Sequence, residues 1–65
     1  MQIQLNGEDV QVAADNLTVL VSELGLEKRM IAIERNMEVV PRSEYSTTEL
    51  QENDRIELVH MIGGG

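Results

Sequence analysis

The sequence contains no cysteine, no phenylalanine and no tryptophan, and only one histidine, one proline and one tyrosine. Without cysteine, the chain can form no disulfide, offer no thiolate nucleophile and build no cysteine-ligated zinc or iron–sulfur site. The single histidine, His60, excludes sites in which two histidines hold a metal, so we expect no metal site. Because aromatic side chains are almost absent, the core must be built from Ile, Leu, Val and Met.

Basic residues are also scarce, with five Lys and Arg against twelve Asp and Glu, which gives a net charge of −7 at pH 7. Nucleic acids and anionic membranes are bound by basic surfaces, so the charge disfavours both as partners. No apolar run approaches the roughly 18 residues of a membrane-spanning helix. The first residues do not resemble a secretory signal, and we therefore expect a soluble cytoplasmic protein.

The length of 65 residues allows one small domain with a thin core and little room for a deep active site. No constellation of catalytic side chains is visible, so we expect that the protein is not an enzyme. We expect a single domain over residues 1–62, followed by a flexible glycine tail over residues 63–65.

Two strands are predicted at the start of the chain. Apolar and polar residues alternate over residues 1–6 and again over residues 8–13, which is the period of a strand with one buried face. Asn6-Gly7 lies between the two runs, and both residues tolerate a positive φ angle. This dipeptide therefore predicts a tight hairpin turn.

A short helix is predicted over residues 17–24. Asn16 is placed to cap its first turn, and Gly25 suits the left-handed conformation that ends many helices. The helix is short and rich in β-branched residues, so packing on a sheet must stabilise it. Four apolar residues recur at helical spacing and form one face: Leu17, Leu20, Val21 and Leu24.

The second half of the chain predicts three more strands. The alternation over residues 31–33 and the apolar pair Val39-Val40, stopped by Pro41, indicate two short strands. Residues 41–54 are polar, and we expect turns and one helical turn there. Two side chains of this segment are expected to point inward: Tyr45 and Leu50.

Asn53-Asp54 marks a turn before a final strand over residues 55–62. The predicted order is thus β-β-α-β-β-β, an α+β fold in which one main helix covers one face of a mixed sheet of four to five strands. Alternation in the final strand places Ile56 and Leu58 toward the helix. We expect three residues on the outer face or at the strand exit to form a partner interface: Val59, Met61 and Ile62.

The last three residues, Gly63-Gly64-Gly65, form the most unusual segment of the chain. A run of glycines is unlike other segments because ordering a glycine costs more conformational entropy than ordering any other residue, and it has no side chain that could pack in return. It offers instead a thin chain with a reach of about 10 Å that can enter a channel too narrow for side chains. The group delivered at its end is the carboxylate of Gly65.

The complete chain resembles the ubiquitin-like β-grasp superfamily and, within it, the sulfur carriers of thiamin biosynthesis, the ThiS family. The short length and the order of elements agree with this resemblance. The segment Val-Pro-Arg followed closely by an aromatic residue is the most specific feature, whereas the terminal Gly-Gly is shared across the superfamily. Four segments carry the resemblance: Ile31-Ala32-Ile33, Val39-Val40-Pro41-Arg42-Ser43-Glu44-Tyr45, Asn53-Asp54 and Ile62-Gly63-Gly64-Gly65.

The resemblance implies that the protein is a co-substrate of other enzymes. An E1-like, ThiF-type enzyme would adenylate the carboxylate of Gly65 with ATP, and a protein persulfide would supply sulfur to form a thiocarboxylate. A ThiG-type thiazole synthase would consume that sulfur, and Gly63 and Gly64 would thread the terminus into both enzymes. ATP and the sulfur donor belong to the partners, and we expect no cofactor bound to the chain itself.

Other functions remain open from the sequence. The chain could carry sulfur for another pathway (molybdopterin, amino-acid or tRNA thiolation), or be a ubiquitin-like modifier joined to lysines. It could also be an interaction module whose tail has no chemistry. The exposed Val59 and Met61 could equally cover a sheet edge or form a homodimer contact.

Overall fold

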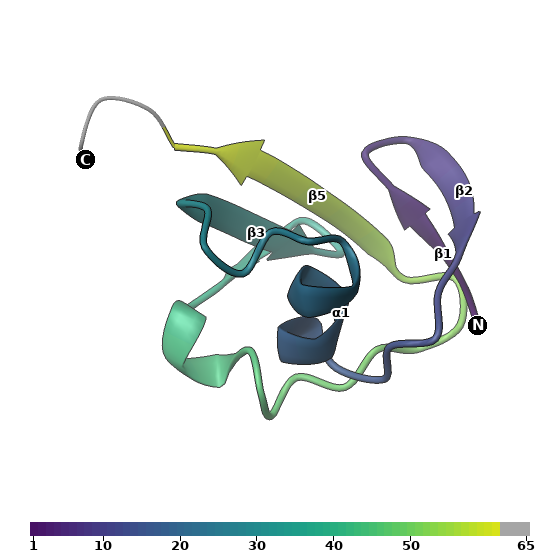
Figure 1. Cartoon of the computed structure of the whole chain (residues 1–65). Helices are drawn as coiled ribbons and strands as arrows, with labels where there is room; N and C mark the ends of the chain where they lie inside the picture. Colours follow the sequence, from purple (N-terminus) through teal and green to yellow (C-terminus); the bar gives the residue numbers. More distant parts are fainter. Residues whose placement is uncertain (62–65) are drawn as a thin grey trace.

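The computed structural model describes residues 1–61, which form a five-stranded mixed sheet with one α-helix against one face (Figure 1). The element order confirms the predicted β-β-α-β-β-β arrangement and the α+β class. The elements are β1 (Gln2–Leu5), β2 (Glu8–Gln11), α1 (Leu17–Glu23), β3 (Ile31–Arg35), β4 (Glu38–Val40), the 3-10 helix η1 (Arg42–Glu44) and β5 (Arg55–His60).

The strand that leads to the C-terminus lies in the middle of the sheet, whose order is β2-β1-β5-β3-β4. On one side, β1 runs parallel to β5 and pairs only with Arg55 and Ile56. On the other side, β3 runs antiparallel and pairs from Ile56 to His60. Beyond Ile56, β5 therefore has a strand partner only in β3, while Ile56 itself has strand partners on both sides.

The first hairpin turns at Asn6 and Gly7, whose φ angles of 50° and 85° confirm the predicted turn. Both strands are shorter than predicted, because β2 ends at Gln11 instead of extending to residue 13. Gln11 pairs with Gln2, and one further hydrogen bond follows, from the N–H of Val12 to the carbonyl oxygen of Met1 at 2.9 Å.

Helix α1 has both predicted end signals. The side chain of Asn16 accepts a hydrogen bond from the N–H of Val19 at 2.8 Å, and Gly25 follows the helix with a φ angle of 72°. The helix has seven residues, and no helix within residues 1–61 is long and apolar enough to cross a membrane. Three of its side chains are buried against the sheet: Leu17, Leu20 and Val21.

The core is aliphatic, with Tyr45 as its one aromatic member, and this confirms the prediction for Ile, Leu and Val. The prediction was wrong for methionine, because all four methionines are exposed and none is in the core. Tyr45 and Leu50 both point inward, which confirms the prediction for the polar segment after β4. Side chains from both halves of the chain meet between α1 and the sheet. The buried set is Ile3, Val12, Ala14, Leu17, Leu20, Val21, Ile31, Ile33, Tyr45, Leu50 and Ile56.

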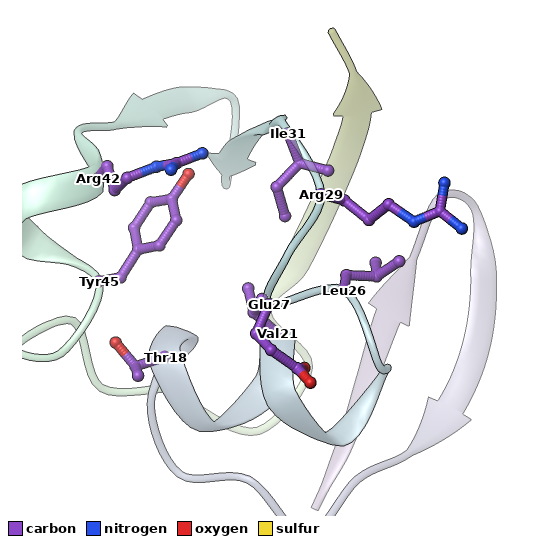
Figure 2. Close-up of a pocket in the computed structure, with 8 residues that line it drawn as sticks. All are labelled: Thr18, Val21, Leu26, Glu27, Arg29, Ile31, Arg42 and Tyr45. Atoms are coloured by element: carbon purple, nitrogen blue, oxygen red, sulfur yellow. The ribbon is translucent and has the colours of Figure 1, made fainter.

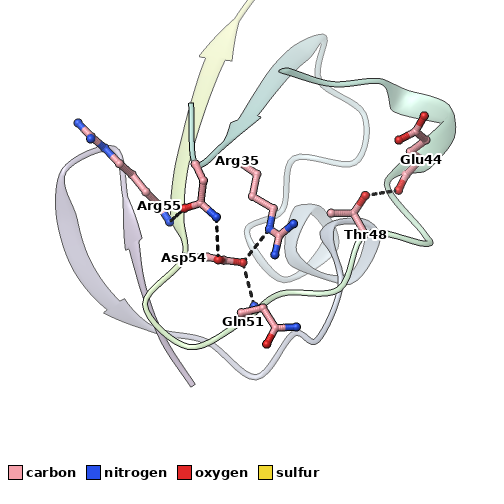
Figure 3. Close-up of polar contacts among 7 residues, drawn as sticks. Arg35, Glu44, Thr48, Gln51, Asp54 and Arg55 are labelled. Carbon is pink, nitrogen blue, oxygen red and sulfur yellow. Dashed lines mark hydrogen bonds and ion pairs between the residues drawn. The ribbon is translucent and has the colours of Figure 1, made fainter. Parts of the chain in front are cut away.

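Asp54 is the one buried charged residue among those described, with 5% of its surface exposed. Its carboxylate accepts hydrogen bonds from Arg35 Nε at 2.8 Å, from Asn36 Nδ2 at 3.0 Å and from the Gln51 N–H at 2.8 Å (Figure 3). Burial raises the pKa of Asp54, but these hydrogen bonds and the Arg35 charge outweigh it and hold the pKa below its ordinary value. This cluster joins the end of β3 to the start of β5.

Candidate functional site

The candidate site is the end of β5 and the chain that follows it. Four of the predicted site residues lie outside the described residues: Ile62, Gly63, Gly64 and Gly65. The described chain leads to them through His60, the last residue of β5, and Met61 (Figure 1). The backbone N–H of Met61 donates to the carbonyl oxygen of Met30 at 2.9 Å, so the chain is still tied to the sheet one residue beyond the strand.

Strand β5 is fixed along its length by contacts of three kinds. The Asp54 cluster holds its start, and the ladder to β3 holds its length. Beyond the end of β1, the turn residue Asn6 also holds β5, because its side-chain oxygen accepts a hydrogen bond from the N–H of Leu58 at 2.8 Å. Strand β5, which leads toward the C-terminal residues, is thus hydrogen-bonded on both sides at Ile56 and Leu58.

The two faces of β5 differ as the alternation predicts. Ile56 is fully buried and Leu58 packs against the core on the α1 side. Val59 and Met61 are 55% and 47% exposed. Their role as a partner interface remains a prediction, but the structure places both beside the origin of the tail.

Val59 and Met61 belong to a larger apolar surface, which we call the outer patch. Ala32 lies directly opposite Val59 in the β3–β5 register, and Met30 lies beside Met61. Val39 is exposed on the adjacent edge strand, β4, on the same face because its neighbour Val40 packs inward. The outer patch therefore consists of Met30, Ala32, Val39, Val59 and Met61.

Alternation in the sequence predicts two of the five members of the outer patch, Val59 and Met61. Met30 and Val39 could have been inferred from the same alternation, because each adjoins an inward-facing residue. The strand register was needed to place them on the face of Val59, where Val39 lies two strands away and directly opposite Glu34. The other half of this face is polar. It presents residues from β2, β1 and the start of β5: Gln2, Gln4, Asp9, Gln11 and Arg55.

An acidic pair borders the outer patch. Glu34 and Glu57 lie directly opposite each other on β3 and β5, an unfavourable arrangement for two like charges. Arg55 Nε lies 3.8 Å from the Glu57 carboxylate and offsets part of this charge. An apolar surface with an acidic border suits a protein partner with a basic rim.

Three comparisons place this site among known proteins. The ThiS family model matches residues 3–65, which include the glycine terminus. The sulfur carrier protein ThiS of Bacillus subtilis is 40% identical over 65 residues, covering 97% of this chain and 98% of that protein. The chain is therefore similar to a carrier of about its own length.

Two longer relatives are named thiazole synthase. Those of Paramagnetospirillum magneticum and Magnetococcus marinus are 39% and 47% identical over 66 residues. The matches cover 100% of this chain but 20% of each relative, so the chain spans about a fifth of their length.

The fold is similar to that of a thiamine biosynthesis protein, ThiS, from Geobacter metallireducens. Its crystal structure aligns with a TM-score of 0.85 and 30% identity, covering 100% of both chains. Its solution structure aligns with a TM-score of 0.79 and 29% identity, covering 100% of this chain and 88% of that one. These similarities confirm the predicted ubiquitin-like β-grasp fold.

Proposed function

Since this chain belongs to the ThiS family, we propose that it is a sulfur carrier of thiamin biosynthesis that carries the sulfur on the carboxyl group of Gly65. The observation that supports this most strongly is the family match through residue 65, because it includes the terminal glycines. The described fold agrees, since its central strand leads directly to those glycines.

The chemistry requires activation, because a carboxylate is a poor electrophile. An E1-like enzyme transfers AMP from ATP to the Gly65 carboxylate and releases pyrophosphate, which makes the carbonyl carbon electrophilic. A protein persulfide attacks that carbon and displaces AMP, and a thiol then cleaves the resulting acyl disulfide to release the thiocarboxylate. The chain contributes the reacting terminus, while ATP and sulfur are supplied through its partners.

The partner that consumes the sulfur is a thiazole synthase on this proposal. Two relatives named thiazole synthase contain a counterpart of this entire chain, which supports a working association between the two proteins. The carrier acts there as a co-substrate, since it supplies sulfur and is returned with a carboxylate terminus. The thin glycine tail suits an enclosed active site, because Gly63 and Gly64 have no side chain to obstruct a channel.

The outer patch is the surface that we assign to docking. It combines exposed apolar side chains with a position beside the origin of the tail, so a partner that binds it also reaches the terminus. Two of its members are methionines, whose flexible side chains can adapt to the surfaces of two different enzymes.

Intact-mass measurement tests this function. The chain is incubated with ATP, an E1-like activating enzyme and a persulfide donor, with a reaction lacking ATP as control. The proposal predicts that the mass of the chain rises by the difference between one sulfur and one oxygen atom, only when ATP is present.

Other outcomes would contradict the proposal in different ways. Conjugates of high mass joined through lysine would identify a protein modifier. An unchanged mass with an enzyme that loads another ThiS protein would indicate an interaction module without tail chemistry. Sulfur loading without delivery to thiazole synthase would favour a carrier for another pathway.

A further inference from the structure

A hollow of about 170 Å³ lies on the α1 side of the sheet, away from the outer patch (Figure 2). It is bounded by α1, by the loop between α1 and β3, and by the 3-10 helix η1. Val21, Leu26 and Ile31 supply apolar lining, and Arg42 and Tyr45 stand together on one side. Ile31 pairs with His60 across the β3–β5 ladder, so the hollow lies next to the end of β5.

Polar groups in this hollow have no partner within the protein. Tyr45 is 9% exposed, yet its hydroxyl makes no hydrogen bond with any other group in residues 1–61. The hydroxyl is therefore open to the hollow, because no buried side-chain nitrogen or oxygen atom of the described residues lacks a hydrogen-bond partner. Figure 2 shows the Arg42 side chain beside that hydroxyl, and no acidic group of the described chain pairs with Arg42.

The lining of the hollow carries two basic side chains, Arg29 and Arg42, against one acidic side chain, Glu27. Of the five basic residues, Arg35 and Arg55 form ion pairs with acidic side chains. The other three have no such pair within the part of the chain that the structure describes. They are Lys28, Arg29 and Arg42, and the last two line the hollow.

Size limits what the hollow can hold. Sites for cofactors and other small molecules usually have volumes of about 300–1,000 Å³, so this one is too small for a nucleotide. It can hold one side chain, whose methylene groups would contact Val21, Leu26 and Ile31. The groups at its edge, a guanidinium and a phenol hydroxyl, are both hydrogen-bond donors suited to a carboxylate.

We propose that the hollow receives an aspartate or glutamate side chain of the thiazole synthase, with Arg42 and the Tyr45 hydroxyl donating hydrogen bonds to its carboxylate. This inference rests on the proposed function, in which two enzymes bind the carrier. We assign the hollow to the synthase because two relatives named thiazole synthase contain a counterpart of this entire chain. The outer patch and the hollow lie on opposite faces of the sheet near the same end of β5. A synthase that contacts both would hold the carrier from two sides while the terminus reacts.

Two substitutions with little structural effect test the hollow. Tyr45→Phe removes only the hydroxyl and keeps the buried ring, and Arg42→Gln removes the charge of an exposed side chain. Lys28→Gln is the matched control, because it removes the same charge from an exposed side chain that forms no ion pair among the described residues and does not line the hollow. Binding of each carrier to thiazole synthase is measured by calorimetry, and sulfur loading by intact mass.

We expect Arg42→Gln to raise the Kd for the synthase about tenfold and Tyr45→Phe about fivefold, with sulfur loading as in the wild type. Lys28→Gln is expected to leave the Kd within about twofold. If Arg42→Gln and Tyr45→Phe bind like the control while the wild type is loaded and binds, the hollow is not the docking site and the proposed function stands. A wild-type chain that is loaded but binds no synthase would overturn both.

The single tyrosine gives a direct readout of occupancy. In a carrier with isotope-labelled tyrosine, NMR reports one residue, Tyr45, against an unlabelled synthase. The proposal predicts that the ring signals shift on binding, and that Arg42→Gln reduces the shift at equal saturation. Unshifted ring signals in a saturated complex would overturn the proposal, as would loss of activating-enzyme binding alone in the Arg42→Gln variant.

Discussion

The backbone N–H of Met61 donates to the carbonyl oxygen of Met30 at 2.9 Å, which extends the β3–β5 ladder past His60. The same two residues contribute exposed side chains to the outer patch. The outer patch and Met61, the last described residue before the glycine tail, are therefore joined by the hydrogen bonds of one sheet. On our proposal, a partner that binds the patch fixes the position from which the tail starts.

The apolar character of the outer patch should be needed for partner binding. Val59→Gln replaces its central side chain without changing charge, and the 55% exposure of Val59 predicts little effect on folding. We expect the Kd for the activating enzyme and for thiazole synthase to rise about tenfold, as for a central interface residue. Surface plasmon resonance with immobilised enzyme measures both constants.

Val19→Gln is the control for this substitution. Val19 is also an exposed valine, but it lies on α1, on the opposite side of the sheet. Its Kd values should remain within about twofold of the wild type. Equal weakening by the two variants would show that the outer patch has no special role.

The Asp54 cluster should make folding stability depend on pH. Because its folded pKa is lowered, the Asp54 carboxylate stabilises the fold above its unfolded pKa of about 4, and this contribution is lost as pH falls through the lower folded value. Asp54→Asn should therefore lower the free energy of unfolding by about 2 kcal/mol at pH 7. The difference from the wild type should shrink below about pH 4.

Urea denaturation at pH 7 and at pH 3 measures this difference. Asp9→Asn is the control, since Asp9 is exposed on β2 and its change should stay within about 0.5 kcal/mol. A loss in Asp54→Asn that is equally large at both pH values would contradict the electrostatic explanation.

Most of the fold could be predicted from local signals. Asn6-Gly7, Asn16 and Gly25 act over a few residues, and the structure confirms each of them. Asp54 could be predicted only as part of a turn, since its partners Arg35 and Asn36 are distant in sequence. Burial of a charged group depends on which strands become neighbours, and alternation along one strand does not contain that information.

The turn between β3 and β4 was missed for a different reason. It is made by Asn36 and Met37, whose φ angles are 52° and 73°. Residues other than glycine seldom adopt a positive φ angle, so a turn with methionine at this position is not indicated by its sequence. The site residues also differ in how far they could be predicted. Alternation along one strand predicts Val59 and Met61, whereas the hollow beside Arg42 is formed with Val21 and Ile31, which are distant in sequence.

Met37→Gly should stabilise the protein. The side chain is 76% exposed, so little packing is lost, and glycine removes the strain of the positive φ angle. We expect a gain of about 0.5–1 kcal/mol and a Tm higher by about 4 °C in calorimetry. Met37→Ala keeps the Cβ atom and should give no gain; an equal rise in both variants would mean that backbone strain is not the cause.

The glycines of the tail should be needed for activation and not for folding. Gly64→Val adds a branched side chain and Gly65→Ala a methyl group next to the reacting carboxylate. We expect Tm to be unchanged and ATP–pyrophosphate exchange with the activating enzyme to fall at least about tenfold, because a narrow channel excludes the added atoms. Exchange at the wild-type rate in both variants would contradict a requirement for a thin tail.

The central claim is that Gly65 itself carries the sulfur, and fragmentation mass spectrometry of the loaded chain tests it most directly. After incubation with ATP, activating enzyme and persulfide donor, the C-terminal peptide is isolated and fragmented. The account predicts that one oxygen is replaced by sulfur and that the fragments place the replacement on Gly65. Sulfur on any other residue, or a C-terminal peptide of unchanged mass from a chain that still supplies thiazole synthase, would contradict it.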